Sequence, residues 1–287
     1  MSGPAYDLTL PEVRTTSVVF ASPHSGRDYG WSFLRRSQLD EQTIRSSEDA
    51  FVDMLFDSVP SQGAPLLAAR APRAYVDLNR SADELDPALI EGVQGTTHNP
   101  RVSSGLGVVP RVVANGRAIY RGKLSLEEAR GRIRDHWHPY HAALEKLVAE
   151  SRRTFGEAIL IDCHSMPHEA IESIGHPRGQ RPEIVLGDRF GAAARCDVVE
   201  RVEAAFATAG FRVVRNAPFA GAYTTQHYGR PSRGQHVVQV EIDRALYMNE
   251  LLVRPNSNYK AFKAQLAGVI AEIAAIGRSS ELPLAAE

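Results

Sequence analysis

The sequence predicts an α/β fold with three layers, in which helices cover both faces of a central mixed, largely parallel β-sheet. Two observations point to this class. Short apolar runs alternate along the chain with longer stretches whose apolar residues have helical spacing. The chain has 287 residues, of which 43% are hydrophobic and 23% charged, so it is long and apolar enough to bury a large core. We therefore expect one α/β domain over residues 1–287.

The predicted strands are short apolar runs that end at glycine, proline or polar residues. The first stops at Pro23, and the run that ends at Cys163 is apolar enough to be buried on both faces. The predicted strands are Ser17–Ser22, Leu66–Ala69, Ala74–Leu78, Glu157–Cys163, Pro182–Gly187, Phe211–Arg215 and His236–Asp243.

The longer stretches repeat apolar residues at intervals of three and four, as the buried face of a helix does. Ser125–Glu128 has the pattern of a capping box, and Pro139 should bend or interrupt the helix that follows. Gly210 closes another of these helices. The predicted helices are 49–59, 125–153, 196–209 and 258–276.

Two irregular segments, near 83–122 and 216–234, interrupt this alternation. Long irregular segments inside a compact domain often form binding loops, so we expect them to be insertions that supply substrate walls. The second contains Tyr223 and His227 in a stretch dense in hydrogen-bond donors. Both side chains are candidates for contact with substrate.

Composition and charge exclude several classes of protein. The chain has 33 Lys and Arg against 34 Asp and Glu, so it lacks the basic excess of a nucleic-acid binder. No apolar stretch is long enough for a membrane helix, and no secretory signal is visible. The two cysteines fit a reducing compartment. We expect a cytoplasmic protein without a nucleic-acid or membrane partner.

Histidines follow or end two of the predicted strands, at His24 and His164. The carboxyl ends of the strands in such a sheet form the ligand crevice, so the two side chains should converge there. A single histidine at a strand end is more often structural. Two histidines and a carboxylate are the usual ligands of a catalytic zinc ion. Asp49, Glu48 and Asp28 are the candidates for the carboxylate.

Glu241 lies in the last predicted strand, where Val238, Val240 and Ile242 share one face and the polar residues share the other. A buried carboxylate needs an ion pair, a raised pKa or a functional role. A salt bridge to Arg244 or to another arginine is one explanation. A role as general base is the other.

Asn79 and Arg80 follow another predicted strand. A guanidinium and an amide together suit a carboxylate on a small substrate. The alternative is a surface arginine paired with Asp83 or Glu84. The histidines of 136–141 cannot all face one point, so we expect them to serve helix packing and the helix surface. The chain has no G-x-S-x-G nucleophile motif and no P-loop.

Together these segments resemble the N-formylglutamate amidohydrolase family, which is related to zinc carboxypeptidases and aspartoacylases. They occur in family order over about 18–249. The resemblance rests on Pro23–Gly26, Glu48–Asp49, Asp77–Arg80, Tyr120–Arg121, Asp162–Ser165, His227–Gly229 and Gln239–Glu241.

The resemblance implies the phosphorylase/hydrolase-like fold of the zinc carboxypeptidases and a single catalytic domain. It also implies one zinc ion, held by His24, Asp49 and His164, with Glu241 as general base. Carboxypeptidase-like enzymes carry an acid three residues after the first histidine, where this chain has Arg27. The acidic ligand must therefore come from elsewhere.

Hydrolysis of an N-acyl amino acid, such as N-formyl-L-glutamate, is the implied reaction. Asn79 and Arg80 would bind a substrate carboxylate, and Arg80 or Arg121 would stabilise the oxyanion. Asp162 should share the strand face of His164 and orient it.

Two other functions compete with this one: a metallo-carboxypeptidase-like hydrolase of short peptides, and a non-catalytic protein that binds a metal or a metabolite. The sequence leaves homo-oligomerisation open.

Overall fold

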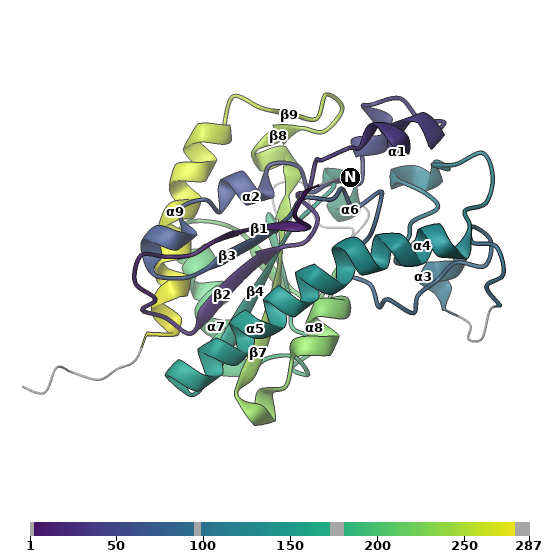
Figure 1. Ribbon diagram of the computed structural model, residues 1–287. Coiled ribbons are helices and arrows are strands. Elements are labelled where there is room, and N and C mark those ends of the chain that lie inside the picture. The colour runs from purple at the N-terminus through teal and green to yellow at the C-terminus, as the bar shows by residue number, and fades with distance from the viewer. Residues whose placement is uncertain (1–2, 95–98, 173–180, 279–287) are drawn as a thin grey trace, which may run out of the picture.

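A seven-stranded sheet lies at the centre of the computed structural model, which describes residues 3–94, 99–172 and 181–278 (Figure 1). The strand order is β1-β3-β2-β4-β7-β5-β6. The strands are β1 (Tyr6–Thr9), β2 (Val18–Ser22), β3 (Leu66–Ala69), β4 (Ala158–Met166), β5 (Ile184–Gly187), β6 (Val213–Arg215) and β7 (Gln235–Asp243). Among these described pairings, β1 runs antiparallel to β3 and β5 runs antiparallel to β7, and the other strand pairs are parallel. The expected mixed, largely parallel sheet is confirmed.

Helices cover both faces of this sheet. They are α1 (Trp31–Arg36), α2 (Val52–Leu55), α3 (Pro100–Ser103), α4 (Leu126–Arg132), α5 (His138–Phe155), α6 (His168–Glu172), α7 (Cys196–Thr208), α8 (Tyr223–Tyr228) and α9 (Tyr259–Ile276). Shorter 3-10 turns are Thr43–Arg45, Val59–Gln62, Ala114–Gly116, Pro231–Arg233 and Arg244–Leu246, and a small hairpin joins β8 (Met248–Asn249) to β9 (Arg254–Pro255).

The alternation of side chains along the strands creates the three layers. Phe20 of β2 and Ile161 of β4 are paired and belong to one core, which α2, α7 and α9 cover. Val19 and Leu160, one position earlier in each strand, point to the other core, under α4 and α5. Figure 1 shows α5 across one face of the strands and α9 along the other side. Both faces are buried, as in other parallel sheets.

The long helix expected over 125–153 is built from two α-helices joined by a π-helical turn. Ser125 caps the first helix, since its hydroxyl accepts a hydrogen bond from the backbone N–H of Glu128 at 3.1 Å. The π turn covers Ile133–Trp137 and ends just before Pro139. Proline has no N–H to donate, so the regular ladder is broken there. The expected interruption near Pro139 is confirmed.

Two predicted elements are wrong, and one strand was missed. Residues 74–78 form a turn in which the backbone N–H of Tyr75 donates to Pro72. The helix expected over 49–59 shrinks to α2, because Phe51 has a left-handed backbone with φ 68°. Strand β1 was missed because its residues are mostly exposed and give no apolar run.

No helix in the described part of the chain combines the length and the apolar character that crossing a bilayer requires.

Candidate metal centre and active site

Three neighbouring parallel strands, β2, β4 and β7, bring the candidate residues to one edge of the sheet. His24 follows the end of β2, and His164 and Glu241 are paired near the ends of β4 and β7. The backbone N–H of Asp49 donates to the carbonyl of His24 at 3.0 Å, which places Asp49 beside it. Parallel strands collect side chains in this way at their carboxyl ends.

His24, Asp49 and His164 form a buried cluster whose facing atoms could hold a metal ion. Oδ2 of Asp49 lies 3.4 Å from Nδ1 of His24 and 3.0 Å from Nδ1 of His164. One ligand atom from each residue lies within 4.8 Å of the other two. Two imidazoles and one carboxylate match the donor set of a catalytic zinc site, which leaves a position open.

A second carboxylate holds each imidazole from its far side. Nε2 of His24 donates to Oδ1 of Asp77 at 2.7 Å, and Nε2 of His164 lies 3.0 Å from Oδ2 of Asp162. These contacts favour a proton on Nε2 of each ring, so that Nδ1 of each ring faces the cluster, where Nδ1 of His164 is within hydrogen-bond distance of Oδ2 of Asp49. Nδ1 of His24 is buried and has no hydrogen-bond partner among the described residues. A metal ion fits these atoms, because it would occupy that unused lone pair.

The carboxylates of the cluster are held ionised. Burial raises the pKa of Asp49, but the hydrogen bond to His164 and the nearby imidazole of His24 outweigh it and bring that pKa well below its usual range. Burial also opposes ionisation of Asp77, where Arg73 and His24 reverse the effect and lower the pKa well below its usual range. Asp49 therefore offers an ionised carboxylate oxygen to a cation.

Arg244 neutralises the other oxygen of Asp49 and fixes its orientation. Its Nη2 atom lies 2.9 Å from Oδ1 of Asp49, and its Nε atom donates to Oγ of Ser165 at 3.1 Å. The salt bridge that we considered for Glu241 is therefore made to Asp49. The sequence did not indicate this partner, because Arg244 and Asp49 are far apart along the chain.

Glu241 is buried and carries no ion pair within the described part of the chain. Its Oε1 atom accepts a hydrogen bond from Nε2 of Gln239 at 2.9 Å, and the backbone N–H of Ala222 donates to Oε1 of Gln239 at 3.1 Å. Burial raises the pKa of the Glu241 carboxyl to about 7, against the attraction of His164. A carboxyl with this pKa can take up and release a proton near neutral pH.

The other two acids considered for the cluster lie elsewhere. Glu48 pairs with Arg45 at 2.9 Å and accepts a hydrogen bond from Tyr29. Asp28 pairs with Arg70 at 2.8 Å. Asp49 is thus the one of the three that lies with the two histidines.

A cavity of about 700 Å³, here called the central cavity, contains the cluster and Glu241. Asn79 and Arg80 line it, and both irregular segments contribute walls, for example Leu106 and Phe219. Nδ2 of Asn79 donates to Asp162 at 3.3 Å. Arg80 is buried, donates to the carbonyl of Leu106, and forms no ion pair with the described acids, so it is not the surface arginine of the alternative explanation.

A side groove of about 560 Å³ adjoins the central cavity, and Arg80, Arg101, Gly221 and Ala222 line both. Tyr223 and His227 lie on the groove, with their rings stacked at 4.9 Å. Both belong to α8, within the segment expected to be irregular. Arg121 is exposed and lines neither the central cavity nor the side groove, which corrects its expected place beside the substrate.

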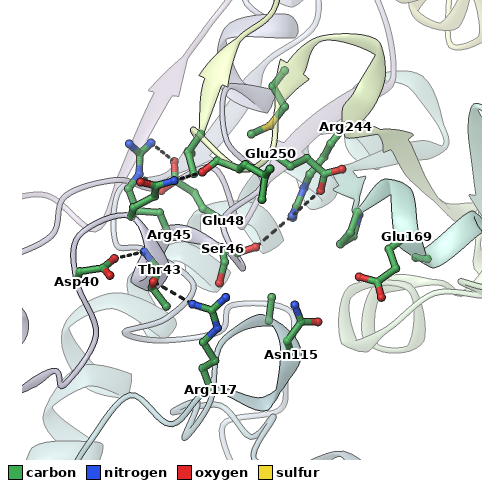
Figure 2. Close-up of a pocket in the computed structure, with 17 residues that line it drawn as sticks. Asp40, Thr43, Arg45, Ser46, Glu48, Asn115, Arg117, Glu169, Arg244 and Glu250 are labelled. Carbon is green, nitrogen blue, oxygen red and sulfur yellow. Dashed lines mark hydrogen bonds and ion pairs between the residues drawn. The ribbon is translucent and has the colours of Figure 1, made fainter.

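A larger cavity, of about 950 Å³, shares Arg244 with the central cavity (Figure 2). Its lining carries charged groups of both signs, and two opposite-charge pairs lie among them, Arg45 with Glu48 and Arg244 with Glu250. Figure 2 shows Arg45 bound to Glu48, Arg117 to Thr43, and Arg244 to the Ser46 carbonyl. Acidic and basic side chains therefore nearly balance in this lining.

The histidine-rich stretch 136–141 supports the site from behind. His136 and His141 are buried and His138 is exposed, as a packing role predicts. Nε2 of His141 donates to the carbonyl of Leu78 at 2.8 Å, and Nε1 of Trp137 donates to the carbonyl of Arg80 at 2.9 Å. These two bonds flank Asn79 and fix the backbone that carries it.

Sequence reasoning missed the contacts of Asp77 and Arg73 at the site. Nε of Arg73 donates to Oδ2 of Asp77 at 3.0 Å. Asp77 comes directly before Leu78, Asn79 and Arg80, so its place in that segment was the available signal.

Comparisons with known proteins agree with this geometry. The family model for N-formylglutamate amidohydrolase matches residues 16–248. The chain is 31% identical over 216 residues to the N-formylglutamate deformylase of Pseudomonas aeruginosa, covering 74% of this chain and 75% of that protein. It is 30% identical over 236 residues to the N-formylglutamate deformylase of Pseudomonas putida, with coverages of 81% and 82%.

Among solved structures, the N-formylglutamate amidohydrolase of Ralstonia eutropha matches with a TM-score of 0.89 and 33% identity. The match covers 96% of this chain and 99% of that one. The chain therefore belongs to the N-formylglutamate amidohydrolase family.

Proposed function

We propose that this protein is a zinc-dependent amidohydrolase that cleaves N-formyl-L-glutamate, or a close N-acyl amino acid, to formate or the corresponding acid and the free amino acid. The observation that carries the proposal is the convergence of His24, Asp49, His164 and Glu241 in one cavity. The names of the relatives support the substrate. A cytoplasmic role in amino-acid metabolism belongs to the same proposal.

His24 and His164 would hold the ion through Nδ1 and Asp49 through Oδ2. The ion would act as a Lewis acid that polarises the scissile carbonyl and makes water a better nucleophile at neutral pH. Asp77 and Asp162 keep both Nε2 atoms protonated and both rings in place.

Glu241 acts as the general base in this proposal. It takes the proton from the attacking water and returns it to the leaving nitrogen, so one carboxylate serves both halves of the reaction. Its raised pKa suits that double task. Gln239 holds the carboxylate by donating to Oε1, while the backbone of Ala222 holds Gln239.

Asn79 and Arg80 bind a substrate carboxylate. The carbonyls of Leu106 and Asn79 accept from Nε and Nη1 of Arg80, which fixes its guanidinium on the cavity wall. A guanidinium fixed in advance loses little entropy when it binds an anion. Tyr223 and His227 form the wall beyond it.

Formate release from N-formyl-L-glutamate tests the proposal directly. We expect the zinc-loaded protein to release formate, a chelator to stop the reaction, and added zinc to restore it. His164→Ala should lose both the metal and the activity. Glu241→Gln should keep the metal and lose activity by roughly 100- to 10,000-fold.

Three outcomes would contradict the proposal. Activity that survives the chelator would argue against a metal, and near-normal turnover by Glu241→Gln would argue against the base. Faster hydrolysis of dipeptides than of N-formyl amino acids would favour a carboxypeptidase-like enzyme. Zinc binding without any hydrolysis would favour a binding protein.

A further inference from the structure

Four guanidinium groups line the central cavity, and two of them are neutralised by neighbouring acids. Arg73 donates to Asp77 at 3.0 Å, and Arg244 pairs with Asp49 at 2.9 Å. The four are Arg73, Arg80, Arg101 and Arg244. The paired arginines belong to the framework around the metal centre, so they are not free to bind an anionic ligand.

The other two arginines carry positive charge without an acidic partner. Arg80 donates only to two backbone carbonyls, those of Leu106 and Asn79. The side chain of Arg101 is exposed and makes no hydrogen bond or ion pair with any residue in the described ranges. The cavity therefore offers two unneutralised guanidinium groups.

Arg80 and Arg101 lie close enough to repel each other. Burial lowers the pKa of Arg80, the nearby charge of Asp77 raises it, and the charges of Arg73 and Arg101 lower it. Both arginines line the central cavity and the side groove, so they lie where the two meet. Anions bound at this place would relieve the repulsion.

The side groove adds positive charge rather than cancelling it. Arg189 and Arg230 also line it. Glu84 is the only acidic residue among the described residues that line the groove. Its carboxylate oxygens already accept hydrogen bonds from the backbone N–H of Ser81 at 3.0 Å and from Nδ2 of Asn99 at 3.2 Å. The positive charge of the side groove therefore favours the binding of an anion at the end of the central cavity that lies away from Glu241.

We propose that Arg101 determines substrate specificity by binding a second carboxylate, the one on the side chain of an N-acyl dicarboxylic amino acid, while Arg80 binds the carboxylate next to the scissile amide. The inference rests on the proposed function and deepens it. Two unneutralised guanidiniums match two carboxylates, and each can bind its anion through paired N–H donors. A substrate with a neutral side chain would offer no carboxylate to pair with Arg101.

The kinetic test compares N-formyl-L-glutamate with N-formyl-L-glutamine, which has nearly the same shape without the second charge. Arg101→Gln should raise KM for N-formyl-L-glutamate by roughly 10- to 100-fold with little change in kcat, and should change the values for N-formyl-L-glutamine by less than about 3-fold. Arg101→Lys, which keeps the charge, should restore part of the loss. Arg130→Gln is the control, because Arg130 is exposed on α4 and lines neither space.

A binding measurement separates this inference from the proposed function. Calorimetry with glutarate, a dicarboxylate that is not hydrolysed, should give weaker binding to zinc-loaded Arg101→Gln than to the wild type or Arg130→Gln. If the wild type cleaves no N-formyl amino acid, the proposed function fails, and the glutarate result still decides the role of Arg101. Equal glutarate binding, or equal losses on both formyl substrates, would overturn the role of Arg101.

Discussion

Asp77 and Asp162 show how single side chains position the candidate metal ligands. Each holds Nε2 of one histidine, and each is almost fully buried, so solvent does not compete for these contacts. An imidazole that is anchored on one side has its other nitrogen fixed in position and orientation. Asp77 and Asp162 therefore determine whether the two imidazoles are positioned to bind one metal ion together with Asp49.

Asp77→Asn should weaken zinc binding by roughly 10- to 100-fold, because the amide cannot support a protonated Nε2 of His24 as a carboxylate does. Competition with a chromogenic chelator measures this affinity. Asp162→Asn should cause a similar loss through His164. Asp53→Asn is the control, since Asp53 pairs with Arg27 and neither residue lines the central cavity. An unchanged zinc affinity in both variants would show that these acids do not support the site.

The element that supports Asn79 from behind is the helix pair joined by the π turn. His141 of α5 donates to the carbonyl of Leu78 through Nε2 and accepts from the hydroxyl of Tyr228 through Nδ1, at 2.8 and 2.9 Å. The bond from Tyr228 requires the neutral ring, because Nδ1 can accept only while it is unprotonated, whereas Nε2 donates in either form. A proton on Nδ1 would remove the acceptor in a buried place, so the fold depends on an uncharged His141.

This dependence predicts a loss of stability in acid. Burial lowers the pKa of His141 from about 6.5 to about 4. Between these values the unfolded chain binds a proton that the folded chain does not, so the free energy of unfolding falls as pH decreases, by about 3 kcal/mol in total. Urea unfolding at about pH 7 and about pH 4 measures the change.

His141→Gln should lose that part of the pH dependence, while His138→Gln, at an exposed position of the same helix, should keep it. If His141→Gln and the wild type lose equal stability between the two pH values, His141 is not the titrating group.

Elements with a strong burial pattern were predictable. The central strands and α7 and α9 lie where apolar periodicity placed them, because both properties come from the same two cores. The predicted strand over 74–78 and the predicted helix over 49–59 were wrong. The apolar residues there are buried mainly by turns and not by a long regular element. Periodicity cannot distinguish these two ways of burying a side chain.

At the scale of the whole molecule, the site joins residues that are distant in sequence. The strand ends allowed His24, His164 and Glu241 to be predicted together, because sheet topology brings strand ends to one edge. The partners Arg244–Asp49 and Arg73–Asp77 depend on the path of loops, which follows no sequence period. For the same reason, Arg121 was expected at the site and lies outside it.

Because the cluster ties segments from across the chain together, zinc should stabilise the whole fold. A ligand that binds only the folded state at about 100 times its Kd adds about 2.7 kcal/mol, which for a chain of this size raises Tm by about 4 to 5 °C. Thermal unfolding with zinc and with a chelator measures the shift. His164→Ala should lose it, and Cys196→Ser, which removes an exposed free thiol outside the lining of the central cavity, should keep it. An equal shift in His164→Ala would mean that zinc stabilises the protein from another site.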